Sequence, residues 1–490
     1  MSVFRTKSVE RSIEDTEAPE HRLRRNLSAL DLTVFGVGVI VGTGIFVLTG
    51  QVARDTAGPA VALSFVVAGV VCALAALCYA EFASTVPVAG SAYTFSYATI
   101  GEFPAWIVGW DLMLELALGA AVVAVGWSGY FSELMASLGV HLPDSLAGEH
   151  ATFNVPAVVV VLALTAVLAA GIKLSARINL VIVTVKVAVV LLVIVAGLFF
   201  VKGANYTPFV PDAQPTPAVH GLKAPLIQVV FGITPVAYGL LGVFVGAAVV
   251  FFAFIGFDVV ATAAEETRRP QRDLPIGIIA SLAVCTVLYV AVSLVVVGMQ
   301  PYNRLSRSAP LAGAFRVVGQ DWLATIISIG ALAGLTTVVM ILMLGQSRIF
   351  FAMSRDRLLP GGLAAVHPRF GTPYRITIII GVVTALLAGF IPLSALAELV
   401  NIGTLFAFVL VSVGVMILRR TRPDLPRAFR TPLVPVVPVL SVLACLYLML
   451  NLPVETWVRF LVWMALGIVL YFAYGRRHSR VEEPSPARAG

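Results

Sequence analysis

The sequence predicts an all-α membrane protein with twelve transmembrane helices, because charge is scarce, apolar runs are long and the loop charges are asymmetric. Of its 490 residues, 59% are hydrophobic and 12% are charged, whereas a soluble domain has about 25% charged residues. A run of about 20 apolar residues crosses a hydrocarbon core of about 30 Å. Twelve such runs begin near Thr33, Ala60, Ala105, Asn154, Ile178, Gly239, Ile276, Trp322, Ile376, Leu396, Leu433 and Thr456.

The loop charges predict the orientation of these spans. Loops on one side carry 25 of the 33 lysines and arginines, and loops on the other side carry 7. The positive-inside rule places the basic side, with both termini, in the cytoplasm, so that the protein is expected in the cytoplasmic (inner) membrane. Membrane orientation therefore explains the net charge of +7, and no nucleic-acid partner is predicted.

The spans divide the chain into six segments. They are a cytoplasmic N-terminal segment 1–32, helices 1–5 in 33–201, an extracellular loop 202–238, helices 6–10 in 239–418, a cytoplasmic loop with helices 11–12 in 419–474, and a disordered cytoplasmic tail 475–490. The first segment has no apolar stretch typical of a signal peptide. All four cysteines fall inside spans, so no disulfide or metal site is expected.

Two spans contain residues that disfavour a continuous helix. The first reads "TVFGVGVIVGTGIFVLTG", with four glycines, and the sixth reads "GAAVVFFAFIGFDVVATAAEE", with Gly256 and Asp258 in the middle. A glycine costs about 1 kcal/mol against alanine in a helix interior. Either small residues allow close helix packing, or both helices are broken. Their positions favour breaks, because helices one and six each begin a group of five, and an odd group must insert in the opposite orientation, as in an inverted repeat.

Broken helices offer backbone groups to a ligand. Unpaired N–H and C=O groups cost several kcal/mol in lipid, and a zwitterionic amino acid satisfies both kinds. N–H groups at the start of the outer half of helix one are expected to face a carboxylate: those of Thr43, Gly44 and Ile45. Free carbonyls are expected to accept from an ammonium: those of Ile40, Phe252, Ala253 and Ile255. Asp258 has two interpretations, a cap of the inner half of helix six or a direct ligand.

Three segments carry a family resemblance. "GVGVIVGTGIFVLTG", "FFAFIGFDVVATAAEETRRPQRDLPIGI" and "GQSRIFFAMSRDRLLP" resemble the amino acid–polyamine–organocation superfamily and, within it, the cationic amino acid transporter family and its bacterial relatives. The resemblance runs from about Leu23 to at least Leu418. It implies a LeuT-like fold of ten core helices plus two, with amino-acid transport as the activity. It also implies that Thr43 and Gly44 hold the substrate carboxylate and that the four carbonyls hold the amine. Gly42 and Gly256, at the breaks, are candidates to line or brace the pocket.

Lys186 lies in the middle of "INLVIVTVKVAVVLLVIVAGLFFV". It is about nine residues from Arg177, roughly 13 Å into the membrane, and a lysine at that depth costs about 2.5–3.5 kcal/mol to insert. Burial disfavours the charged form of an amine, so this position suits a group that gains and loses a proton. The resemblance implies that Lys186 replaces a coupling sodium ion. We predict that Lys186 bridges helix one when charged and releases it when neutral; the alternative is a polar cross-link of constant charge.

Other polar residues in the spans give weaker predictions. Glu115, in "WDLMLELALG", is interpreted as a hydrogen-bonded brace, with direct substrate contact as the alternative, and Asp111 lies one turn earlier on the same face. Glu81 is expected at the membrane interface. On helix eight, Met343 shares a face with Thr336 and Met340; this face either lines the pocket or packs in the core.

Together these features predict a secondary transporter of L-amino acids, coupled to proton symport, with small neutral substrates favoured and no cofactor. Three alternatives stay open: transport of cationic amino acids, a proton-independent exchanger or uniporter, and a sensor that binds amino acids without moving them. No catalytic motif indicates an enzyme. The sequence does not indicate whether a small single-helix accessory subunit binds.

Overall fold

The computed structural model describes residues 26–479 except 87–90, 144, 149–150, 172–175, 216–220, 234–235 and 366–371. Nearly all regular structure in this part is helical. The α-helices are α2 (Ala29–Ile40), α3 (Thr49–Val52), α4 (Val61–Thr85), α5 (Ser91–Thr99), α6 (Glu102–Ser137), α7 (Val155–Ala169), α8 (Ala176–Leu198), α9 (Leu226–Phe231), α10 (Gly239–Val250), α11 (Pro270–Met299), α12 (Pro310–Val317), α13 (Asp321–Arg355), α14 (Tyr374–Phe390), α15 (Leu393–Thr421), α16 (Val436–Leu450), α17 (Val454–Leu470) and α18 (Arg476–His478). Strands β1 (Gln214–Pro215) and β2 (Val236–Ala237) pair antiparallel, with Gln214 opposite Ala237.

The chain is a mostly helical polytopic membrane protein. Within the described residues, eight helical segments are long and apolar enough to cross a membrane. Four shorter apolar helices accompany them: α2, α7, α14 and α16. Each predicted span begins within or next to a helical segment of the structure, while the number of crossings, twelve, stays a prediction.

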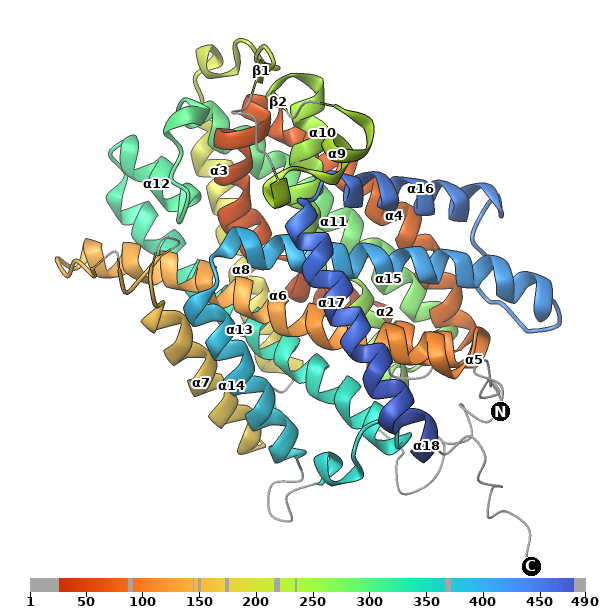
Figure 1. Ribbon diagram of the computed structural model, residues 1–490. Helices are drawn as coiled ribbons and strands as arrows, with labels where there is room; N and C mark the ends of the chain where they lie inside the picture. Colours follow the sequence, from red (N-terminus) through yellow and green to blue (C-terminus); the bar gives the residue numbers. More distant parts are fainter. Residues whose placement is uncertain are drawn as a thin grey trace, which may run out of the picture.

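Long helices pack side by side around the centre of the molecule (Figure 1). Extensive contacts join, among other pairs, α6 to α13, α4 to α11, α15 to α6 and α14 to α7. At one end of the bundle, α3, α9 and the β1–β2 pair lie together, and α18 lies at the opposite end. The segment "APLIQVVFGI" forms only the six-residue helix α9, which is too short to cross the membrane.

Both ends of the described chain differ from the predicted boundaries. Helix α2 begins at Ala29, four residues before Thr33, because Ser28 caps it: the Ser28 hydroxyl accepts from the Asp31 N–H, and the Asp31 side chain accepts from the Ser28 N–H. The tail was predicted to be disordered from residue 475, but residues 476–478 form α18. The Ser479 hydroxyl donates to Glu102, which holds this end against α6. Residues 480–490 lie outside the described part.

A buried ion-pair cluster joins the end of α4 to the last turn of α15 and the segment that follows it. The Glu81 side chain is 2% exposed, and Arg419 donates to both of its oxygens, at 2.9 and 2.7 Å. Arg427 Nε lies 3.3 Å from the same carboxylate, and the Thr431 N–H donates to it at 2.7 Å. The prediction of an interfacial residue gave no indication of this burial, since the partners are more than 300 positions away in sequence.

Replacing Glu81 by alanine is expected to lower the free energy of unfolding by about 3–5 kcal/mol, because it leaves two arginines without their buried counter-ion. The measurement is the apparent Tm of the purified protein in detergent. Glu455→Ala is the control, since Glu455 pairs with Arg459 at the surface, where a pair contributes at most about 1 kcal/mol. Equal Tm shifts for the two variants would contradict the prediction.

Candidate functional site

The first helix is interrupted where the glycines predict it. Helix α2 ends at Ile40, Val41 leaves the helical region with ψ 88°, and helical geometry resumes at Thr43. A π-helical segment, η1 (Gly44–Leu48), then leads into α3. The N–H groups of the first turn of a helix have no partner within that helix. Thr43, Gly44 and Ile45 therefore lie in the first turn after the break, and the binding of a carboxylate by their N–H groups stays a prediction.

The sixth helix changes its geometry twice. Helix α10 ends at Val250 and continues as a 3-10 segment, η6 (Phe251–Phe254). Ile255 is extended, with φ −62° and ψ 137°, and Gly256 has φ +116°, which only glycine adopts without strain. A second 3-10 segment, η7 (Asp258–Glu266), follows. The predicted break at Gly256 is present, because this residue supplies the corner.

The two breaks touch each other. A Cβ atom on Gly44 would overlap the Cβ and Cα atoms of Ala253, so glycine is what lets η1 approach the backbone of η6. On the other side of the corner, a Cβ on Gly256 would lie 2.6 Å from a methyl group of Val39 in α2. Two segments some 200 residues apart in the chain therefore meet through backbone atoms, at the residues predicted to hold a ligand.

Tyr289 of α11 bridges the breaks. Its hydroxyl lies 2.6 Å from the Ile40 carbonyl oxygen and 2.8 Å from the Ala253 carbonyl oxygen. The side chain is fully buried, and its ring packs against Phe65 and Phe254. Since a hydroxyl has one proton, it donates to one carbonyl at a time, and the other carbonyl retains its capacity to accept.

Two further backbone carbonyls of helix six accept hydrogen bonds. The Phe252 carbonyl accepts from the Ile255 N–H at 3.2 Å. The Asn401 amide of α15 donates to the Ala248 carbonyl at 2.8 Å. Of the carbonyls predicted to be free, that of Phe252 thus accepts a hydrogen bond within the protein, and those of Ile40 and Ala253 share the one proton of the Tyr289 hydroxyl. One feature of the sequence could have indicated Tyr289: it is a tyrosine inside an apolar span, and a tyrosine hydroxyl needs a partner when buried.

Lys186 reaches from α8 to the first helix. Its side chain is fully buried, and its Nζ donates to the Gly38 carbonyl of α2 at 2.7 Å. A Cβ on Gly334 of α13 would lie 2.9 Å from the Lys186 Cε, so glycine makes room for the lysine chain. The predicted contact with helix one is present in the structure, two residues before the last residue of α2. Its part in proton coupling stays a prediction.

A group of buried acids lies beside the sixth helix. Asp111 and Glu115 of α6 are 0% and 2% exposed, and Glu115 interacts electrostatically with Asp258 and Asp111. Among the described residues, none of the carboxylate oxygens of Asp111 and Glu115 has a hydrogen-bond partner within 3.5 Å. The Thr404 hydroxyl lies near Glu115 and donates to the Val400 carbonyl, and the role of Glu115 as a brace stays a prediction.

The surroundings of Asp258 and Met343 bear on the two interpretations that the sequence left open for each residue. Asp258 is the first residue of η7 and not the residue before it, and its carboxylate interacts with the backbone N–H groups of Gly256 and Val259. This contact fits the capping interpretation better than free presentation to a ligand. Met343 is fully buried in α13 and belongs to the main hydrophobic cluster, as the core-packing interpretation expects.

Polar contacts join the ends of the broken helices to the rest of the bundle. Beyond the outer half of helix one, Arg307 donates to both oxygens of Asp55, at 3.2 and 2.7 Å. At the other end, Arg348 of α13 lies 3.3 Å from Glu266, the last residue of η7. Such exposed ion pairs contribute little stability individually.

The sequence of this chain is similar to those of several known proteins. A family profile of amino acid permeases matches residues 27–473. The chain is 50% identical to the branched-chain amino acid permease BcaP of Bacillus subtilis and 48% identical to the methylthioribose transporter of the same organism, in both cases over 98% of this chain and 99% of the relative. It is 38% identical to cationic amino acid transporter 1 of Arabidopsis thaliana, over 85% of this chain and 68% of the relative.

Proposed function

Because the chain belongs to the amino acid permease family, we propose that it is a secondary transporter that carries L-amino acids across the cytoplasmic membrane by alternating access. The family consists of transporters and not of enzymes. In this proposal both termini are cytoplasmic, the substrate is a neutral amino acid, and an inward proton gradient drives uptake.

A LeuT-like arrangement of two inverted five-helix repeats is part of the proposal. The breaks at Gly42 and Gly256 lie in the first and sixth of the predicted spans, which begin the two groups of five. In transporters built from inverted repeats, paired discontinuous helices hold the substrate at the middle of the membrane. Their contact through Gly44 and Ala253 supports the same arrangement here.

The single observation that supports an amino acid as the substrate is the contact between the two helix breaks. N–H groups at Thr43, Gly44 and Ile45 suit a carboxylate, and the carbonyls of Ile40, Ala253 and Ile255 suit an ammonium group. Backbone groups at both ends leave the side-chain pocket to decide which amino acid binds. The similarity to a branched-chain amino acid permease favours neutral, apolar side chains.

Proton coupling is assigned to Lys186. When charged, its ammonium donates to the Gly38 carbonyl and ties α2 to α8. When neutral, the amine makes a weaker bond, and the inner half of helix one is released to move. Proton binding and release then bias two conformations of the same helix.

A second candidate substrate is methylthioribose, because the chain is 48% identical to a methylthioribose transporter. This molecule has neither a carboxylate nor an ammonium group, so the helix breaks would bind it only through its hydroxyl groups. Cationic amino acids are a third candidate, and the Arabidopsis relative supports them. A proton-independent exchanger and a non-transporting sensor remain alternatives to symport.

Uptake by proteoliposomes tests the proposal. Radiolabelled L-valine, L-alanine and L-arginine are offered with and without an inward proton gradient, and unlabelled methylthioribose serves as a competitor. We expect saturable, gradient-stimulated uptake of L-valine or L-alanine, little uptake of L-arginine and no competition. Strong competition by methylthioribose would overturn the zwitterion assignment. Counterflow without stimulation would indicate an exchanger, and a ligand-induced rise in Tm without uptake would indicate a sensor.

A further inference from the structure

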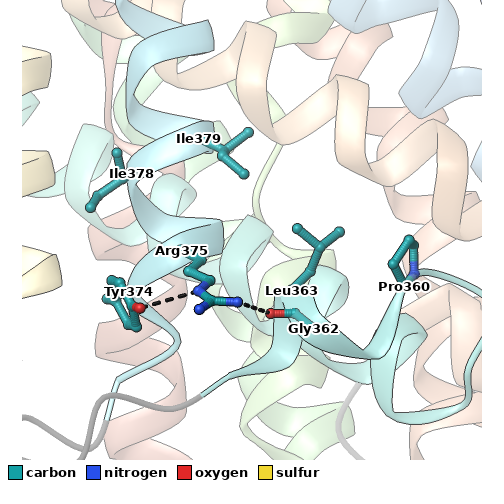
Figure 2. A pocket seen from close by; sticks show the side chains of 7 residues that line it. All are labelled: Pro360, Gly362, Leu363, Tyr374, Arg375, Ile378 and Ile379. Atoms are coloured by element: carbon teal, nitrogen blue, oxygen red, sulfur yellow. Dashed lines mark hydrogen bonds between the residues drawn. The ribbon is translucent and has the colours of Figure 1, made fainter.

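A pocket of about 460 Å³ lies at the start of α14, outside the helix breaks (Figure 2). One wall is the first turns of α14, and the other is the short helical segment after α13. In Figure 2, Arg375 lies between Tyr374 and Gly362, with Ile378 and Ile379 further along the helix. The lining residues are Pro360, Gly362, Leu363, Tyr374, Arg375, Ile378 and Ile379.

The polar end of this pocket is a positioned cation. Arg375 Nη1 donates to the Gly362 carbonyl at 3.2 Å, and its Nε donates to the Tyr374 hydroxyl at 3.1 Å. These bonds hold the guanidinium at the pocket, and the side chain is exposed. None of the lining residues is acidic, and among the described residues no carboxylate forms an ion pair with Arg375. The site therefore carries an uncompensated positive charge, assisted by the N-terminal dipole of α14.

The apolar end of the pocket continues along α14. Ile378 and Ile379 are 46% and 50% exposed, and further exposed apolar residues follow at helical spacing. Those residues are Val382, Val383, Leu386 and Phe390. From residue 378 to residue 390 this stripe is about 18 Å long at 1.5 Å per residue, close to the roughly 15 Å of one leaflet of the hydrocarbon core.

We propose that this pocket binds one anionic phospholipid, with the phosphate at Arg375 and an acyl chain along the exposed stripe of α14. A fixed guanidinium suits a phosphate oxygen pair, and basic pockets beside transmembrane helices on the cytoplasmic side recognise anionic lipid head groups. The positive-inside rule places the start of α14 on that side. A soluble anion would use Arg375 alone, whereas a lipid also covers the apolar stripe.

Native mass spectrometry of the full-length protein, released from nanodiscs of phosphatidylcholine with phosphatidylglycerol, tests the proposal. We expect wild type to retain one phosphatidylglycerol, and Arg375→Gln to reduce that retention about fivefold, the effect of one arginine at a membrane surface. Arg420→Gln is the matched control, because Arg420 is exposed in the last turn of α15 and outside the pocket. Retention by Arg375→Gln equal to that of Arg420→Gln would overturn the proposal.

A second variant and a competitor separate the sources of the phosphate. Ile379→Asn is expected to weaken phosphatidylglycerol retention while Arg375 is intact, and glycerophosphoglycerol, which has the head group without chains, is expected not to displace the lipid. Displacement by glycerophosphoglycerol would show an anion site and overturn the acyl-chain contact. A protein dimer that both variants abolish would assign the surface to a second copy instead. Because the readout is binding, none of these outcomes depends on the proposed transport.

Discussion

Replacing Gly44 by alanine is expected to reduce substrate uptake by roughly 5- to 150-fold, the equivalent of about 1–3 kcal/mol of overpacking. The new methyl group would occupy the space of Ala253, including its Cα, so a change of rotamer cannot relieve the overlap. The backbone of η1 or η6 must move apart instead. Since the substrate is proposed to bind these two backbones, their separation removes the geometry that holds a carboxylate and an ammonium group together.

The controls for Gly44 use glycines with room for a methyl group. A Cβ on Gly119 of α6 would lie 3.5 Å from Leu342, an ordinary contact, so Gly119→Ala is expected to transport like wild type. Gly42 lies in the same break, but its nearest neighbour is a Val338 methyl at 3.5 Å, so Gly42→Ala should lose less activity than Gly44→Ala. Size-exclusion chromatography checks that each variant is folded. Uptake by Gly44→Ala equal to that by Gly119→Ala would contradict the predicted contact.

The sequence allowed the breaks to be predicted because their cause is local. One span contains four glycines and another contains Gly256 and Asp258, so each pattern lies within a short stretch of the chain. Because unpaired backbone groups are costly in lipid, such a pattern indicates a break whose backbone groups bind a partner. Burial of Lys186 could be predicted in the same way, from its distance to the nearest loop. The helical class required only composition and the lengths of the apolar runs.

The partners of these groups could not be predicted because they come from distant positions. Tyr289 reaches the Ile40 carbonyl across 249 positions, and Asn401 reaches the Ala248 carbonyl across 153. A local pattern shows that a carbonyl loses its helical partner, but not which side chain replaces it. For the same reason the burial of Glu81 was missed: Arg419 lies in the last turn of α15 and Arg427 follows that helix. Only the packing of α15 against α4 brings them to Glu81.

Replacing Lys186 by methionine is expected to abolish the stimulation of uptake by an inward proton gradient while substrate exchange continues. Methionine has nearly the length of lysine and fills the space beside Gly334, so the variant removes the amine without opening a large cavity. It leaves the Gly38 carbonyl without its donor, at a cost of about 1–3 kcal/mol, which favours the conformation in which helix one has moved. Uptake into proteoliposomes is measured with and without the gradient, together with counterflow at equal pH.

Lys202→Met is the matched control for this experiment, because Lys202 follows the same helix but is exposed, and it should leave gradient stimulation intact. A loss of both counterflow and stimulation in Lys186→Met would indicate the alternative interpretation, a cross-link of constant charge that the fold needs. Full stimulation in Lys186→Met would remove the lysine from proton coupling altogether. The buried acids Asp111 and Glu115, which lack hydrogen-bond partners within the described residues, would then be the next groups to replace. The bond from Lys186 to Gly38 lies two residues before the last residue of α2, so a change of charge there would act on the half of helix one that is proposed to move during transport.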